Sequence, residues 1–87
     1  MANPAVTACT KDAWTKVATS VTSGQIHILS KAPRQYAHTY RLTGGDAPTT
    51  LAEAVVIEST SIPISAPANI DVYLYAFGAA GSVRVDV

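Results

Sequence analysis

The chain has 87 residues, of which 48% are hydrophobic and 14% charged, and its formal net charge at pH 7 is zero. This length suits one domain, and such a short chain buries only about 60–65% of the surface that its unfolded state exposes. Zero net charge excludes a general electrostatic attraction to nucleic acid or to an anionic membrane. A single cysteine, Cys9, excludes a disulfide within the chain.

In the first half of the chain, β-branched and apolar residues predict four strands separated by turn formers. They span residues 5–9, 14–21, 25–29 and 36–42. The run Trp14–Val21 also fits helical spacing, but it is short and rich in threonine and serine, which favours a strand. Thr22–Gly24 is predicted to be a turn between the second and third strands.

The second half begins with the longest predicted loop, Thr43–Thr50, which is rich in glycine, aspartate and proline. Leu51–Ala54 fits either one helical turn or the start of a strand. Short strands are then predicted at residues 54–57 and 62–64, with Pro63 confining the second of them to a sheet edge. A turn at Ser65–Ala68 leads into the carboxyl-terminal stretch.

Residues 69–87 show the clearest alternation in the chain. From Ile70 to Phe77, small or aliphatic side chains alternate with an aspartate and aromatic side chains, and valines alternate with charged residues from Val83 to Val87. Gly78–Gly81 interrupts the two runs, so the sequence predicts a hairpin. Because the first strand is apolar on one face and aromatic on the other, we expect it to be covered on both sides.

Together these segments predict an all-β fold, with residues 1–87 forming a single β domain. Seven to eight short strands at roughly ten-residue spacing are typical of a small antiparallel sandwich or barrel. No helix of ten residues or more is required by the pattern.

Charge is distributed unevenly along the chain. Residues 1–45 hold five basic residues and one acidic residue, a balance of +4, and residues 46–87 hold one basic and five acidic residues, a balance of −4. The two halves either pair as neighbouring strands within the fold or meet head to tail between subunits. We favour pairing within the fold, because screened surface charges organise assemblies only weakly.

The residue pattern gives little support for catalysis or for metal binding. His27, His38 and Cys9 lack the paired spacing of a metal site, and the strained turn that carries a nucleophilic serine is absent. Gly44 and Gly45 lack the lysine that follows in a phosphate-binding loop. We therefore expect a protein without enzymatic activity, metal or cofactor.

Aromatic side chains on two of the predicted strands form the candidate interface of this chain. They are Tyr36, Tyr40, Tyr73, Tyr75 and Phe77. Such residues are most often sandwich core with cross-strand aromatic pairs. They also suit a contact with another protein, where tyrosine is enriched, or a stacking platform for sugar or single-stranded nucleic acid.

The amino terminus lacks a basic segment followed by an apolar run, so no signal peptide is predicted. No apolar run is long enough to span a membrane. Both features, with the lone cysteine, fit a protein made in a reducing compartment. If the protein ends up outside a cell, we expect it to leave by a route other than ordinary secretion.

Segments spread over most of the chain carry a resemblance to a known group of proteins. They are Val6–Trp14, Val17–Gly24, Tyr40–Gly44, Ile70–Tyr73 and Gly81–Val87. In these segments the chain resembles small uncharacterised proteins that tailed bacteriophages and prophages encode. The resemblance is one of pattern and contains no catalytic or ligand motif, so it implies no site residues.

This resemblance implies a structural role in the virion, as a head decoration protein or as a module of a fibre or tail. The expected partners are further copies of the chain, for example in a trimer, and a capsid or tail protein, with neither nucleic acid nor membrane involved. The expected location is the virion, after synthesis in the host cytoplasm. The alternative is a carbohydrate- or host-surface-binding β-sandwich module that uses Tyr36, Tyr40, Tyr73 and Tyr75.

Overall fold

The computed structural model describes residues 5–29, 35–52, 54–57 and 59–86 of the chain. The fold is all-β, as predicted, with 73% of residues in strands and no helix in the described part. The strands are β1 (Ala5–Cys9), β2 (Trp14–Ile28), β3 (Gln35–Leu42), β4 (Val55–Ile57), β5 (Ser61–Phe77) and β6 (Gly81–Asp86). They form one antiparallel sheet of six strands in the order β1-β6-β2-β5-β3-β4.

Two long strands replace four of the short strands that the sequence predicts. The predicted strands at residues 14–21 and 25–29 are joined in β2, and those at residues 62–64 and 70–77 are joined in β5. The turns predicted at Thr22–Gly24 and Ser65–Ala68 are therefore wrong. The chain bends at these places without leaving the sheet, because register shifts between Lys16 and Ser23 act as β-bulges.

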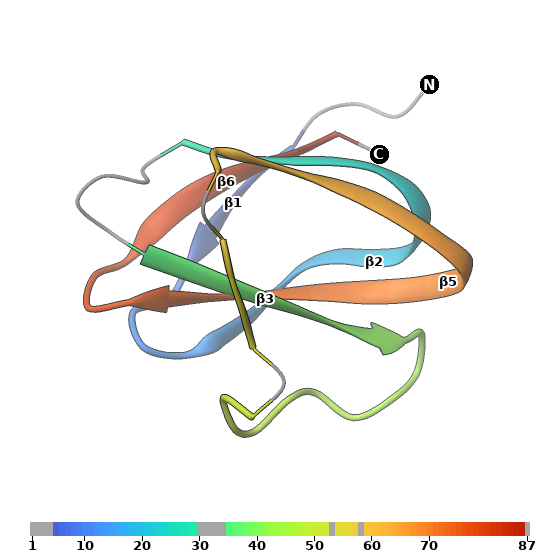
Figure 1. Ribbon diagram of the computed structural model, residues 1–87, viewed down its shortest axis with the longest axis horizontal. Helices are drawn as coiled ribbons and strands as arrows, with labels where there is room; N and C mark the ends of the chain where they lie inside the picture. Colours follow the sequence, from blue (N-terminus) through green and yellow to red (C-terminus); the bar gives the residue numbers. More distant parts are fainter. Residues whose placement is uncertain (1–4, 30–34, 53, 58, 87) are drawn as a thin grey trace.

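The bends of β2 and β5 fold the single sheet into two layers. The first half of β2 pairs with the second half of β5, which also pairs with β3, and β3 pairs with β4. The second half of β2 pairs with the first half of β5 and with β6, and β6 pairs with β1. Figure 1 shows β2 and β5 curving back together at the right-hand side of the molecule. The result is a sandwich-like arrangement of layers.

The predicted carboxyl-terminal hairpin does not form. β6 pairs with β1 and β2, and it has no pairing with β5. The reason is that both edges of the second half of β5 are already occupied, by β3 on one side and by β2 on the other. Gly78, with a φ of 78°, instead begins a short link that carries the chain to the other layer.

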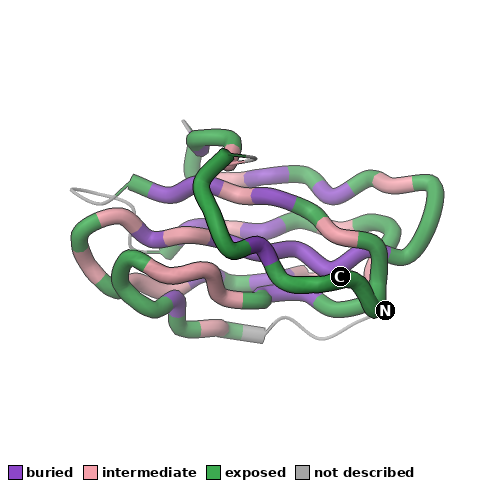
Figure 2. The backbone as a smooth tube through the Cα atoms, turned by 90° about the horizontal axis from the view of Figure 1, so that it is seen from below, coloured by how far each residue is buried: buried purple, intermediate pink, exposed green. Residues whose placement is uncertain are grey.

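The core lies between the two layers and is built from both of them. Its buried members are Cys9, Val17, Ala18, Ile26, Ile28, Tyr36, Ile57, Ile62, Ile64, Ile70, Val72, Leu74, Ala76, Val83 and Val85. Figure 2 shows the buried segments in the middle of the strands and exposed chain at the two sides. The alternation predicted for β6 is confirmed, since Val83 and Val85 are buried and Arg84 is exposed.

The prediction that β5 is covered on both sides is also confirmed for its central part. Every residue from Ile70 to Leu74 is buried, although their side chains point alternately to the two faces. Val72 and Leu74 face the opposite layer and have no exposed surface. Asp71 and Tyr73 point to the outer face, and they retain only 2% and 5% exposure.

Candidate functional site

The five aromatic residues predicted as an interface lie on two different faces of the sheet. In an antiparallel pair, residues opposite each other point to the same side. Tyr36 lies opposite Ala76, and Tyr40 lies opposite Val72, so both share the inward face of β5. Tyr73, Tyr75 and Phe77 occupy the other positions of β5 and point outward. The structure therefore does not bring the five side chains onto one surface.

Two of the five are core residues in the isolated chain. Tyr36 has no exposed surface and belongs to the cluster between the layers. Tyr73 is 5% exposed, and Lys16 Nζ lies 5.9 Å from the centre of its ring. The three remaining aromatic residues, Tyr40, Tyr75 and Phe77, retain exposed surface. Whether these three contact a partner stays a prediction.

A row of aromatic side chains crosses the outer face at the end of β5, and one of its members was not among the predicted residues. Trp14 lies opposite Tyr75 in the β2–β5 register. Their ring centres are 5.4 Å apart in an edge-to-face arrangement, and those of Tyr75 and Phe77 are 4.8 Å apart. We call Trp14, Tyr75 and Phe77 the aromatic row. Trp14 is also the one tryptophan of the sequence, but only the register reveals its aromatic neighbours.

The segment after β3 folds over one end of the aromatic row. Trp14 Nε1 donates a hydrogen bond of 3.0 Å to the backbone oxygen of Thr50, and Pro48 in the same segment is buried. A hollow of about 350 Å³ remains between this segment and the aromatic row. Its walls are formed by Asp12–Trp14, Pro48–Leu51 and Tyr75. The loop predicted at Thr43–Thr50 thus contributes to a concave site.

Asp12 is fixed at the rim of this hollow by its backbone and by its side chain. Its backbone takes a left-handed conformation with a φ of 50°, which aspartate tolerates better than most residues. Its backbone N–H donates to the oxygen of Ala76 at 2.7 Å. Its Oδ1 accepts a hydrogen bond of 2.8 Å from the backbone N–H of Gly78. These bonds hold a carboxylate next to the aromatic row.

A second exposed surface lies at the edge of the sheet formed by β3 and β4. Four apolar or aromatic side chains are exposed there: Tyr40 by 40%, Leu42 by 67%, Val55 by 56% and Val56 by 54%. We call these four residues the β4 edge surface. Val55 lies opposite His38 and shares the face of Tyr40 and Leu42, whereas Val56 lies opposite Ala37 and points to the other face. β4 ends the strand order, so on its outer side no strand of the described chain covers it. Such edges favour pairing with other chains.

Asp71 is a buried carboxylate that holds the bend of β2. The backbone N–H of Ser20, a residue with a φ of 56°, donates to Asp71 Oδ1 at 2.9 Å. Thr43 Oγ1 donates to the same oxygen at 3.2 Å, and Lys16 Nζ lies 3.5 Å from Oδ2. The hydrogen bond from Ser20 is the main cause of the lowered pKa of Asp71. Burial raises this pKa, whereas Lys16 and Thr43 lower it further.

The Lys16–Asp71 pair joins the basic half of the sequence to its acidic half. His27, which is not counted in the charge balance, also contacts the acidic half: its Nε2 lies 3.1 Å from Asp86 Oδ2. Both pairs lie within one molecule, as expected for halves that pair within the fold.

The remaining titratable groups of the described residues do not gather into a chemical site. His38 is partly buried, which lowers its pKa, and its Nδ1 has no hydrogen-bond partner in the described part of the chain. Its ring centre lies 5.2 Å from that of Tyr40. Among the described residues, no three histidine, cysteine or acidic side chains are grouped as metal ligands would be.

Cys9 is predicted to be inert in the folded protein. It is 1% exposed, and burial raises its pKa from 9.0 to about 11. The thiolate fraction near pH 8 is therefore about 100-fold lower than for an unburied thiol. We expect iodoacetamide to label Cys9 at least 100-fold more slowly in native protein than in urea, as followed by mass spectrometry. Equal rates in the two conditions would show that the thiol is accessible.

Comparison with known proteins gave no match: no family model, no curated protein and no solved structure is significantly similar to this chain. The described part of the chain has no helix that is long and apolar enough to cross a membrane.

Proposed function

We propose that this protein is a structural component of a bacteriophage virion, in which it associates with further copies of itself and with a capsid or tail protein. The sequence resemblance supports the assignment to a virion, and the observation that carries the proposed self-association is the β4 edge surface. Exposed apolar side chains occur singly on most proteins. Here Leu42, Val55 and Val56 are each more than half exposed, and they belong to two strands that pair with each other.

Burial of this surface in an assembly supplies the driving force. Covering a valine or leucine side chain completely is worth about 1.5–3 kcal/mol. Tyr40, Leu42 and Val55 offer apolar surface on one face of the edge, and Val56 offers it on the other face. A short domain of this type gains stability from association. The low content of charged residues, 14%, fits a surface that is partly covered by other chains.

The edge position of β4 supports the same mechanism. A strand that ends a sheet can be extended by a strand from another chain through backbone hydrogen bonds. No charged side chain of β4 itself blocks such an approach, because its three residues are Val55, Val56 and Ile57. Charges on edge strands are the usual protection against unwanted pairing, and β4 lacks them.

Charge placed on β4 is expected to abolish self-association. The double variant Val55→Lys/Val56→Lys is predicted to sediment as a monomer at micromolar concentrations at which the unmodified protein is an oligomer. Substitutions at exposed positions usually change the free energy of unfolding by only about 0.5 kcal/mol. The variant is therefore expected to remain folded, as measured by circular dichroism.

The matched control is Val6→Lys, on the opposite edge strand β1, where the valine is 66% exposed. This variant is expected to keep the oligomer. An unmodified protein that stays monomeric, or an oligomer that survives the changes on β4, contradicts the assignment. Mass spectrometry of purified virions tests the particle itself: peptides of this chain are expected, and their absence refutes the proposed location.

A further inference from the structure

We propose that the hollow beside the aromatic row is a binding site for a neutral saccharide of one or two rings. The site is distinct from the β4 edge surface, so it does not depend on the proposed self-association. It also differs from the four-tyrosine surface considered for a carbohydrate-binding module, because two of those tyrosines are buried.

The walls of the hollow combine the two kinds of group that a sugar requires. Trp14 and Tyr75 supply aromatic surface, with their ring planes inclined by 70°, against which the C–H face of a pyranose can pack. Asp12, Thr49 and Thr50 supply a carboxylate and hydroxyl groups at the rim. A few convergent polar groups of this kind orient the ligand in small-molecule sites.

The size of the hollow limits the ligand. Its volume is about 350 Å³, at the lower end of the range of about 300–1,000 Å³ that is usual for small-molecule sites. One or two sugar rings fit such a space, whereas a long oligosaccharide would extend beyond it.

Charge at the hollow argues against anionic ligands. Asp12 is the one ionisable acidic or basic side chain among the lining residues, and no lysine or arginine is among them. A phosphate or a nucleotide would meet a carboxylate with no compensating cation. An organic cation is the competing ligand, because aromatic rings and a carboxylate also suit an alkylammonium group. The threonine hydroxyls favour the sugar, since its several hydroxyl groups both donate and accept hydrogen bonds, whereas an ammonium group can only donate.

Hydrogen bonds within the protein hold the side chains of the hollow in place when no ligand is bound. The bond from Trp14 Nε1 to Thr50 fixes the indole, and the bond from Gly78 to Oδ1 fixes the carboxylate of Asp12. Side chains held in place in this way lose little further freedom on binding. Affinity for a single sugar ring is nevertheless expected to be on the order of 1 mM, because the contact area is small.

Trp14 provides a direct readout of binding because the sequence has one tryptophan. A panel of neutral mono- and disaccharides, including glucose, galactose, mannose, N-acetylglucosamine and lactose, is titrated at millimolar concentrations. Tryptophan fluorescence and the indole N–H signal in proton–nitrogen NMR spectra are followed. We expect at least one sugar to produce a saturable shift. Choline and glucose 6-phosphate, titrated in parallel, are expected to bind at least tenfold more weakly.

Two variants assign the binding to the hollow. Asp12→Asn retains the oxygen that accepts from Gly78 but removes the charge, and we expect it to weaken sugar binding by roughly tenfold. Thr49→Val removes a hydroxyl and is expected to weaken binding severalfold. Tyr40→Ala, on the β4 edge surface, is the matched control and is expected to bind as tightly as the unmodified protein.

The proposal is overturned if no sugar of the panel shifts the Trp14 signals, or if choline binds more tightly than every sugar. It is also overturned if Asp12→Asn and Thr49→Val, both folded, bind with unchanged affinity. Because Val55→Lys/Val56→Lys leaves the hollow intact, its sugar binding is expected to persist, which separates a failure of this inference from a failure of the proposed self-association.

Discussion

Replacing Tyr36 with alanine is expected to lower the free energy of unfolding by about 3–5 kcal/mol, as for other buried aromatic side chains. Tyr36 has no exposed surface and packs between the two layers, so its removal leaves a cavity lined by aliphatic residues. A domain of this size is stable by only about 5–15 kcal/mol. The variant is therefore expected to unfold at a much lower urea concentration, measured by circular dichroism.

Tyr40→Ala is the control on the same strand and the same face of β3. Tyr40 is 40% exposed, and its removal is expected to change the free energy of unfolding by about 1 kcal/mol or less. The pair of variants separates the two interpretations that the sequence left open for these tyrosines, core and contact surface. A larger loss at Tyr40 than at Tyr36 is incompatible with the observed burial.

Asp71→Asn is expected to lower the melting temperature at pH 7 by roughly 5–10 °C. The neutral amide weakens the bonds from Ser20 and Thr43 and removes the partner of Lys16. The left-handed backbone at Ser20 then loses its chief stabilising contact, so the bend of β2 is weakened. Thermal unfolding followed by circular dichroism measures the effect.

Asp71 also makes the free energy of unfolding depend on pH, and the direction of this dependence follows from its lowered pKa. Because the pKa of Asp71 in the folded protein lies below its ordinary value of 3.8, the unfolded chain binds the proton more readily. The stabilisation by this carboxylate is therefore present above the unfolded pKa and is lost as the pH falls through the folded pKa. The unmodified protein is expected to lose stability below about pH 5, and Asp71→Asn is expected to lose less over the same range.

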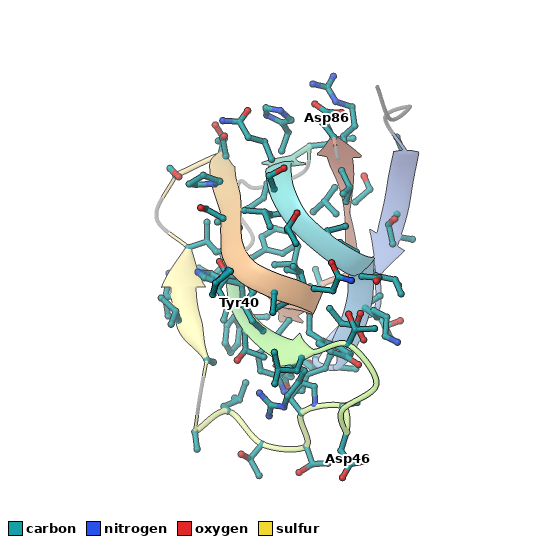
Figure 3. All side chains as sticks on the ribbon, turned by 90° about the vertical axis from the view of Figure 1, so that its right-hand side faces the viewer. Tyr40, Asp46 and Asp86 are labelled. Atoms are coloured by element: carbon teal, nitrogen blue, oxygen red, sulfur yellow. The ribbon has the colours of Figure 1, made fainter. Side chains whose placement is uncertain are left out.

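Asp46→Asn is the matched control for this experiment. Asp46 is exposed in the segment after β3, and Figure 3 shows it at one end of the molecule, with Asp86 at the other end. Its replacement is expected to leave both the melting temperature and its dependence on pH unchanged. If Asp71→Asn behaves like Asp46→Asn, the carboxylate of Asp71 does not hold the bend.

Part of the candidate sites could be anticipated from the residues alone. The outward position of Tyr75 and Phe77 follows from their alternation with Leu74 and Ala76, which are buried. The aromatic row could not be anticipated, because Trp14 reaches Tyr75 only through the register of two strands that are far apart in sequence. The β4 edge surface likewise depends on the position of a three-residue strand at the end of the sheet.

The two wrongly predicted turns have a common cause. Thr22–Gly24 and Ser65–Ala68 have the composition of turns. Composition indicates where the backbone can bend, but it does not indicate whether the chain leaves the sheet there. In the folded protein, β2 and β5 pair with each other on both sides of their bends, which keeps the bent segments in the sheet.

The all-β class and the alternation of β6 and of the second half of β5 were determined by the sequence itself, because the alternation of side chains is a local property with a period of two residues. The tertiary structure alone decided which strands are neighbours, in which register they pair, and that two long strands bend to form both layers. These features depend on contacts between distant segments, such as that between Ser20 and Asp71. The candidate sites belong to the second group, because each combines side chains that only strand pairing brings together.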